Sequence, residues 1–143
     1  MSKKHRVLLC DDNGLVRASV QEYLKQQADI LVVGEASGGQ AGINAALELL
    51  PDLVLMDVSM PEVDGIEATR RIMAKASEVK VLAYSGEWRW VIVKQMLAAG
   101  ARGYVLKQGD PEELVCAIRM VLAGGSFLSP RLMGTTPPAE YKP

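Results

Sequence analysis

Five apolar runs along the chain have the composition of β-strands that are buried on both faces. They occupy residues 6–10, 30–36, 52–57, 80–85 and 103–107 and read RVLLC, ILVVGEA, DLVLMD, KVLAYS and GYVLK. Apolar residues are nearly continuous in these runs and do not alternate with polar ones, which is typical of parallel strands covered by helices on both sides. The pattern therefore predicts a buried parallel sheet.

Helical patterns separate and follow these runs. Apolar residues recur at helical spacing in residues 14–27, 39–50, 65–76 and 88–98. In the last helix, Asp110 is suited to the N-cap, Pro111 to the first helical position and Glu113 to the third. Gly124 and Gly125 then end this helix.

The alternation of five strands with five helices predicts an α/β fold with a single five-stranded parallel sheet and helices on both faces. Short right-handed crossovers leave few other arrangements. We expect the strand order 2-1-3-4-5, in which the first and third strands are neighbours whose crossovers leave on opposite faces of the sheet. This opens a crevice beyond their carboxyl ends, where a ligand site is expected.

The composition indicates one soluble globular domain. The 143 residues include 16 Lys and Arg against 17 Asp and Glu, a formal charge of −1, and 49% are hydrophobic. No basic excess suggests nucleic acid as a direct partner, and the N-terminus has too few apolar residues for a signal peptide or a membrane span, so we expect a cytoplasmic protein. Cys10 and Cys116 lie in apolar runs and are expected to be buried thiols.

Three acids fall at the crevice between the first and third strands. Asp11 and Asp12 follow the first strand, and Asp57 ends the third. Carboxylates this close repel one another unless a cation joins them. Oxygen ligands without Cys or His suit Mg²⁺ rather than zinc, and His5, the only histidine, is expected to be exposed rather than a ligand.

Two further strand ends point to the same crevice. Ser85 ends the fourth strand with a hydroxyl, and Lys107 ends the fifth with an ammonium group. Each is weak evidence alone, since strand-end Ser and Lys are usually turn or solvated residues. Together with a metal-bound carboxylate, they are the groups needed to hold a phosphoryl group.

The stretches LLCDD, LVLMDVSMPEVDG, VLAYSG and GYVLK resemble the receiver domain of bacterial two-component response regulators. The resemblance covers residues 5–125 and implies the flavodoxin-like (βα)5 fold of that family. It also implies that Asp57 is the phosphoacceptor for a sensor histidine kinase. Such a domain catalyses its own phosphorylation and dephosphorylation and is not otherwise an enzyme.

The resemblance also implies a role for the neighbouring residues. Ser85 and Lys107 would contact the phosphoryl oxygens, and Tyr104 matches the aromatic switch position of the family. Tyr104 would enter space that opens when the phosphoryl group draws in the Ser85 hydroxyl. The implied Mg²⁺ ligands are Asp11, Asp12, Asp57 and the backbone carbonyl of Ser59.

Some positions depart from the family pattern. Gln108 stands where many receivers have a proline preceded by a cis bond, so the conformation of the Lys107–Gln108 bond is open. Ser85 replaces the commoner threonine and keeps its hydroxyl. Trp88 and Trp90 fit either the core or an exposed apolar patch for a partner.

The later part of the chain resembles the subclass that carries a LuxR-type (LuxR/FixJ) helix-turn-helix after the receiver, an output domain absent from this chain. We expect a receiver in residues 1–125 and a linker in residues 126–143. The chain is then either part of a longer protein, the favoured reading, or a stand-alone receiver. DNA would be bound only through the output domain, and no membrane contact is expected.

The expected output surface is formed by the fourth helix, the fifth strand and the fifth helix. Trp90, Val93 and Met96 are its candidate apolar contacts. Phosphorylation would favour a homodimer on this surface, or on the first and fifth helices as the alternative.

Two other functions fit part of the pattern. Enzymes of the haloacid dehalogenase type also use an aspartate nucleophile with Mg²⁺ and a lysine. They need a second aspartate two residues later, where this chain has Ser59, and a cap domain, which it lacks. A receiver fold that acts by protein contacts alone, without phosphate, is the second alternative.

Overall fold

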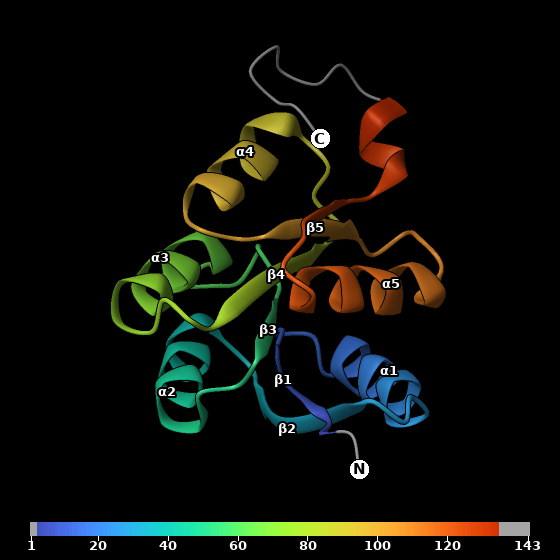
Figure 1. The fold of residues 1–143 in the computed structure, drawn as a ribbon. Helices are drawn as coiled ribbons and strands as arrows, with labels where there is room; N and C mark the ends of the chain where they lie inside the picture. The colour runs from blue at the N-terminus through green and yellow to red at the C-terminus, as the bar shows by residue number, and fades with distance from the viewer. Residues whose placement is uncertain (1–2, 135–143) are drawn as a thin grey trace.

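The computed structural model describes residues 3–134, and its centre is one sheet of six parallel strands (Figure 1). The strand order is β2-β1-β3-β4-β5-β6, so the predicted order of the first five strands is confirmed. A short sixth strand was not predicted. The strands are β1 His5–Cys10, β2 Ile30–Ala36, β3 Leu53–Met56, β4 Lys80–Ser85, β5 Gly103–Leu106 and β6 Phe127–Leu128.

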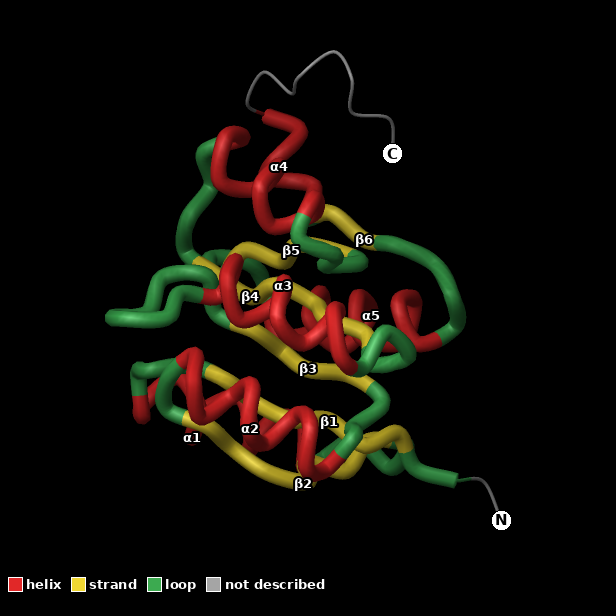
Figure 2. Tube along the Cα trace, turned by 90° about the vertical axis from the view of Figure 1, so that its left-hand side faces the viewer, coloured by secondary structure: helices red, strands yellow, loops and turns green. Residues whose placement is uncertain are grey.

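Helices cover both faces of the sheet, as predicted. One face carries α1 and α5, and the other carries α2, α3 and α4 (Figures 1 and 2). No helix within residues 3–134 has the length and apolar character needed to span a bilayer. The helices are α1 Gly14–Lys25, α2 Gly39–Leu49, α3 Gly65–Lys75, α4 Trp90–Ala98 and α5 Pro111–Leu122, followed by the short 3-10 helix η1 Pro130–Gly134.

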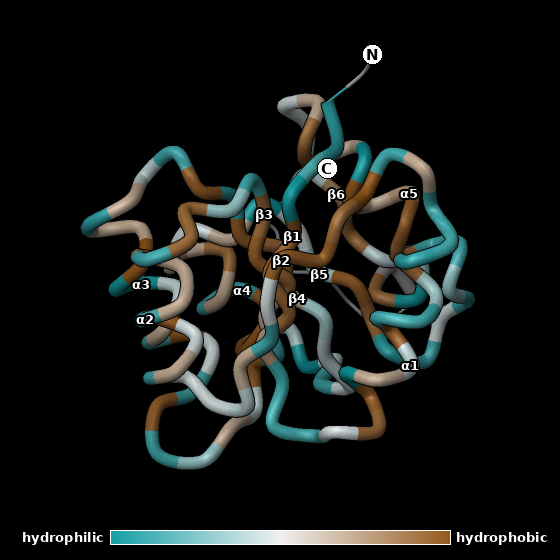
Figure 3. Tube along the Cα trace, turned by 90° about the horizontal axis from the view of Figure 1, so that it is seen from below, coloured by the Kyte–Doolittle hydropathy of each residue, from teal (hydrophilic) through white to brown (hydrophobic). Residues whose placement is uncertain are grey.

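Successive strand residues pack into two separate cores, which explains the continuous apolar runs. In β1, Leu8 and Cys10 belong to the core under α2, α3 and α4. Val7 and Leu9 belong to the core under α1 and α5. Figure 3 shows the apolar strands between the two helix layers. Both faces of each central strand must therefore be apolar.

Local signals mark the starts of α1 and α5. Asn13 precedes α1, and its side chain accepts hydrogen bonds from the backbone N–H groups of Leu15 and Val16. Asp110 occupies the N-cap position of α5 and Pro111 the first helical position, as predicted. The Asp110 side chain makes no capping hydrogen bond, however, so its position rather than a side-chain bond marks the start of α5.

The sheet continues past residue 125, where the linker was predicted to begin. Phe127 and Leu128 pair with Gly103 and Tyr104 of β5. Ser129, which follows, is fully buried. The first residues of the predicted linker are therefore packed onto the domain, whereas residues 135–143 lie outside the described part of the chain.

One prediction about α4 is corrected. Val93 and Met96 are fully buried, so they are not output contacts. They lie one helical turn apart on the face of α4 that packs on the sheet, which leaves Val91 as the exposed large apolar residue of this helix, at 59% exposure. Trp88 is exposed and Trp90 packs partly against the core, so the two tryptophans have different environments.

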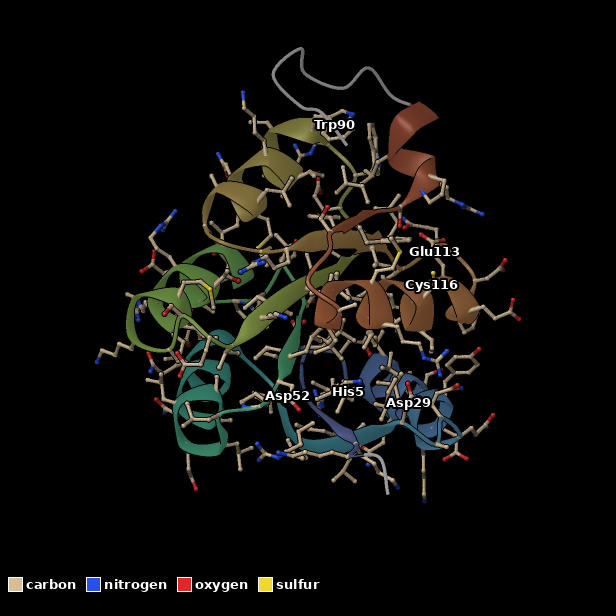
Figure 4. All side chains as sticks on the ribbon, viewed as in Figure 1. His5, Asp29, Asp52, Trp90, Glu113 and Cys116 are labelled. Atoms are coloured by element: carbon tan, nitrogen blue, oxygen red, sulfur yellow. The ribbon has the colours of Figure 1, made fainter. Side chains whose placement is uncertain are left out.

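Cys116 is exposed (Figure 4), contrary to the prediction for both thiols. Cys10 is buried, as predicted. The α5 helix buries its neighbours Val115 and Ala117, and Cys116 lies on the outer face. His5 begins β1 next to Asp29, whose carbonyl accepts its N–H at 2.8 Å. His5 and Asp11 therefore lie at opposite ends of β1.

The start of α3 lies directly against the backbone of Asp57. A Cβ atom on Gly65 would overlap the carbonyl oxygen of Asp57 and crowd Val58. The Gly65 N–H also donates to the Val58 carbonyl at 2.8 Å. The glycine that ends the stretch LVLMDVSMPEVDG therefore lets a helix end pack beside the acid.

We expect Gly65→Ala to lower the free energy of unfolding by about 1–3 kcal/mol, because its methyl group would overlap backbone that cannot rotate away. Urea denaturation measures the change. Gly38→Ala is the control, since no heavy atom lies within 4 Å of its Cβ position, and it should cost less than about 1 kcal/mol. Equal stability of the two variants would contradict the expectation.

Candidate functional site

The strand ends bring the predicted site residues together at one edge of the sheet. The Asp57 N–H donates to the Cys10 carbonyl at 2.9 Å, which fixes the end of β3 beside the end of β1. The Lys107 N–H donates to the Ser85 carbonyl at 3.0 Å, which fixes the end of β5 beside that of β4. Asp11 and Asp57 thus lie at one pair of neighbouring strand ends and Ser85 and Lys107 at the next, and β3 and β4 are themselves paired.

Three carboxylates form an acidic cluster at this edge. One oxygen each from Asp11, Asp12 and Asp57 lie within 4.8 Å of one another. Asp11 and Asp57 are buried, whereas Asp12 is exposed and opens the cluster to water. The three could hold a metal ion, and their oxygen-only donor set fits a hard cation such as Mg²⁺. Ser59, whose carbonyl was the fourth predicted ligand, is exposed two residues after Asp57.

Lys107 bridges two of the acids. Its Nζ lies 2.7 Å from Oδ2 of Asp11 and 3.5 Å from Oδ1 of Asp57. The ammonium group also lies 5.9 Å from the centre of the Tyr84 ring. The cation predicted to contact a phosphoryl group is therefore already held beside the predicted phosphoacceptor.

Burial and charge shift the titration of this group of residues. Burial raises the pKa of Asp57 to about 6, and the charges of Asp11 and Asp12 add to this, while Lys107 acts in the opposite direction. Burial lowers the pKa of Lys107, but its hydrogen bond to Asp11 and the charge of Asp57 outweigh this, so the pKa is raised overall. Lys107 therefore stays charged while Asp57 carries a destabilised negative charge.

Ser85 and Tyr104 meet at the loop after β4. Ser85 is almost fully buried, and its Oγ accepts the N–H of Glu87 at 3.2 Å. Tyr104 is fully buried, and its hydroxyl donates to the Glu87 carbonyl at 2.7 Å. Burial raises the pKa of Tyr104 to about 12, so the hydroxyl stays a donor. Tyr104 is thus already buried beside this loop, and its movement on phosphorylation stays a prediction.

Several contacts of the site were not predicted. Arg17 of α1 donates to the Asp11 carbonyl at 2.6 Å and to the Glu35 carboxylate at 3.2 Å. Its place in the first turn of α1, after Asp11, was the available signal. The bond from Tyr104 to Glu87 had no such signal, because its acceptor is a backbone carbonyl that every residue has.

The loop after Lys107 is held without a proline. Every peptide bond of residues 3–134 is trans, including the bond between Lys107 and Gln108. The Gln108 side chain donates to the Gly86 carbonyl at 3.1 Å. This hydrogen bond joins the loop after β5 to the loop after β4.

A parallel sheet of this order, with an acidic cluster and a lysine at its carboxyl edge, defines the receiver class of signalling domains. Residues 7–119 match the family described as the response regulator receiver domain. The chain therefore belongs to the response regulator receiver family. This membership does not favour a haloacid dehalogenase or a phosphate-independent receiver.

Known relatives agree with this assignment. The chain is 40% identical over 127 residues to the response regulator GacA of Pseudomonas viridiflava, a match that covers 89% of this chain and 59% of GacA. It is 40% identical over 129 residues to the transcriptional regulatory protein LiaR of Bacillus subtilis, covering 90% of this chain and 61% of LiaR. The chain thus spans about three fifths of the length of these relatives.

Solved structures show the same fold. A LuxR-family response regulator from Aurantimonas superposes with a TM-score of 0.88 at 33% identity and covers 92% of this chain and 94% of its own. The receiver domain of the putative response regulator NarL from Mycobacterium tuberculosis has a TM-score of 0.83 at 33% identity and covers 86% and 99%. Both similarities extend over nearly the whole described chain.

The raised pKa of Asp57 predicts how stability depends on pH. Its pKa in the folded protein, about 6, lies above the ordinary value of 3.8, so ionisation favours unfolding. This destabilisation grows as pH rises from about 4 to about 6 and is complete above that. We therefore expect Asp57→Asn to stabilise the fold above pH 6 and to have little effect at pH 4, as measured by urea denaturation with metal chelated.

Asp110→Asn is the control, because the exposed Asp110 side chain makes no capping hydrogen bond. Its effect on the free energy of unfolding should not follow this pH course. A constant difference between wild type and Asp57→Asn from pH 4 to pH 8 would contradict the raised pKa.

Proposed function

We propose that this receiver is a phosphorylation-activated switch in which Asp57 accepts a phosphoryl group from the phosphohistidine of a sensor histidine kinase. The observation that carries the proposal is the position of the Lys107 ammonium group between the buried carboxylates of Asp11 and Asp57. A buried acid with a raised pKa beside a fixed cation is typical of a reactive site. Membership in the receiver family gives this site its expected chemistry.

The proposed step is an in-line displacement at phosphorus. A carboxylate oxygen of Asp57 forms the new O–P bond while the P–N bond to the histidine breaks, and the product is an acyl phosphate. Lys107, within 3.5 Å of Asp57, would pair with the oxygens of the transferring group. The buried Ser85 hydroxyl would donate a hydrogen bond to one of them. The domain would thus catalyse its own phosphorylation, and hydrolysis of the acyl phosphate would reset it.

Mg²⁺ would be held by Asp11, Asp12, Asp57 and the backbone carbonyl of Ser59. When bound, it would neutralise charge on the phosphoryl oxygens. Asp11 has a second role in this scheme, because its Oδ2 already holds the Lys107 ammonium.

Cys10 is not a rival nucleophile. Burial, helped by Asp11 and Asp57, raises the pKa of this thiol to about 12.

The output would be control of transcription through a separate domain. The relative LiaR is a transcriptional regulatory protein, and RcsB, a structural neighbour at 27% identity, is known as dimers bound to DNA. We propose that phosphorylation changes the surface formed by α4, β5 and α5, and that the receiver dimerises there or through α1 and α5. DNA binding would belong to a LuxR-type output domain, and the switch would act in the cytoplasm.

The proposal predicts one phosphorylated residue. Acetyl phosphate with Mg²⁺ should add the mass of one phosphate to the intact chain, because the site itself holds the catalytic groups. Asp57→Asn should add none, since an amide cannot form the acyl phosphate. Equal labelling of the variant, measured by intact mass, would remove Asp57 as the phosphoacceptor.

The acidic cluster predicts a Mg²⁺ dependence that one ligand controls. Asp12→Ala should weaken Mg²⁺ binding and slow labelling at low Mg²⁺, because one of three clustered carboxylates is lost. The measurement is the phosphorylation rate as Mg²⁺ is titrated. Glu48→Ala, which removes an exposed carboxylate of α2, is the control. Identical rates for Asp12→Ala and wild type at every Mg²⁺ concentration would exclude Asp12 as a ligand.

A further inference from the structure

The segment after α5 is attached to the strand that carries two site residues. Its β6 strand lies beside β5 at the edge of the sheet (Figure 2). The Ser129 N–H donates to the Tyr104 carbonyl at 3.0 Å, which extends this pairing by one residue. Tyr104 therefore shares its backbone hydrogen bonding with the chain that leaves the domain.

Ser129 makes a buried side-chain link between three elements. It is fully buried, and its Oγ accepts the Leu106 N–H at 2.8 Å. The same hydroxyl donates to Oε1 of Glu113, in the first turn of α5 (Figure 4). One hydroxyl thus joins the segment, β5 and α5, and both its donor and its acceptor capacity are used.

The end of β5 is consequently held from both sides. On one side, the Lys107 N–H bonds to Ser85 of β4. On the other, the N–H of the preceding residue, Leu106, bonds to Ser129. Since successive backbone N–H groups of a strand point in opposite directions, these two bonds together fix the peptide from which the Lys107 side chain projects.

The Glu113 carboxylate is the acceptor of the Ser129 hydroxyl. Glu113 stands where a capping box would turn its side chain back to the N-cap, but the carboxylate bonds to Ser129 instead. A Cβ on Gly109 would overlap its other oxygen, Oε2, so a glycine in the Lys107 loop makes room for it. The loop that follows Lys107 is therefore packed against the acceptor of the Ser129 hydroxyl.

Leu132, at the far end of the segment, packs in the same core as Tyr104. Leu132 is fully buried in the same cluster as Tyr104 and Met96. The Leu132 N–H donates to the Ser129 carbonyl at 2.9 Å. The segment from Phe127 to Leu132, called here the C-terminal latch, thus contacts β5 at Tyr104 and next to Lys107.

We propose that the C-terminal latch is part of the phosphorylation switch, with Ser129 and Glu113 as positioning residues for Lys107. The inference rests on the proposed function, because Lys107 must bind the phosphoryl group for the latch to respond. A phosphoryl group on Asp57 adds partners for Lys107 and Ser85 and so restrains the end of β5. Through Ser129, the same restraint tightens the latch and fixes the direction in which the chain leaves the receiver.

Amide hydrogen exchange at Leu106 and Leu132 tests the proposal in the chain of residues 1–143. The exchange is followed by NMR with Mg²⁺, with and without beryllofluoride, a mimic of the acyl phosphate. In the wild type, beryllofluoride should slow exchange at both amides by about tenfold, which corresponds to about 1.4 kcal/mol. Fluorine NMR of the same samples gives the affinity for beryllofluoride.

Ser129→Ala removes the hydroxyl and should have three effects. Exchange at Leu106 should be about tenfold faster without beryllofluoride, because a buried hydrogen bond is lost. The slowing at Leu132 should disappear. Beryllofluoride should bind more weakly, which a merely structural linker would not cause. Ser126→Ala, which changes the exposed serine just before the latch, should behave as the wild type.

Variants of Glu113 keep the test decisive if Ser129→Ala does not fold. Glu113→Gln retains an oxygen acceptor for the Ser129 hydroxyl and should respond as the wild type. Glu113→Ala lacks it and should lose the slowing at Leu132. Equal responses in these two variants would overturn the latch.

The failure of the latch and that of the proposed function give different results. If beryllofluoride binds the wild type but leaves exchange at Leu132 unchanged, the latch is overturned and the switch stands. If Ser129→Ala binds beryllofluoride with wild-type affinity and slows Leu132 normally, the latch is likewise overturned. If the wild type binds no beryllofluoride at all, the proposed function falls and the latch with it.

Discussion

One ammonium group shared by two buried carboxylates is the constraint around which this domain is arranged. The Nζ of Lys107 lies 2.7 Å from Asp11 and 3.5 Å from Asp57, although the three residues follow three different strands. Charges in such a place are costly unless they are paired closely, so the strands must end at the same level. Strand register achieves this: Cys10 is opposite Met56, and Ser85 is opposite Leu106. Asp11, Asp57 and Lys107 come directly after Cys10, Met56 and Leu106.

The two apolar cores make this register robust. Because each central strand is buried on both faces, a slip by one residue would exchange every side chain between cores built for different partners. Gly65 adds a further restraint, since only a residue without a side chain can pack against the carbonyl of Asp57. The acidic edge is thus closely packed at β1 and β3. Its exposed side, at Asp12, remains open to solvent.

Most of the fold and the position of the site could be predicted because they depend on strong periodic signals. Continuous apolar runs fixed the strands, and their charged or hydroxyl ends located Asp57, Ser85 and Lys107. The β6 strand escaped prediction because two residues carry no period. The misplaced Val93 and Met96 have another cause. The α4 helix is apolar nearly all round, so its sequence does not show which side faces the core.

Contacts to backbone atoms were the other class that could not be predicted. Tyr104 bonds to the carbonyl of Glu87, Arg17 to that of Asp11, and Ser129 to the N–H of Leu106. Residue identity says nothing about a backbone partner, which is set only by how loops and strands meet in space. The hydrogen bonds that join the site to the loop after β4 and to the segment after α5 are of this kind, since each has a backbone partner.

The two cysteines differ in a way that has a practical consequence. Burial, helped by the neighbouring carboxylates, raises the pKa of Cys10 and keeps this thiol protonated, whereas Cys116 is exposed on the outer face of α5. Thiolates, not thiols, react with alkylating reagents, and reagents reach exposed groups first. The unmodified chain therefore offers a single-site attachment point for a fluorophore or spin label. That point lies on the helix that carries Glu113, so native α5 can be followed spectroscopically without engineering the protein.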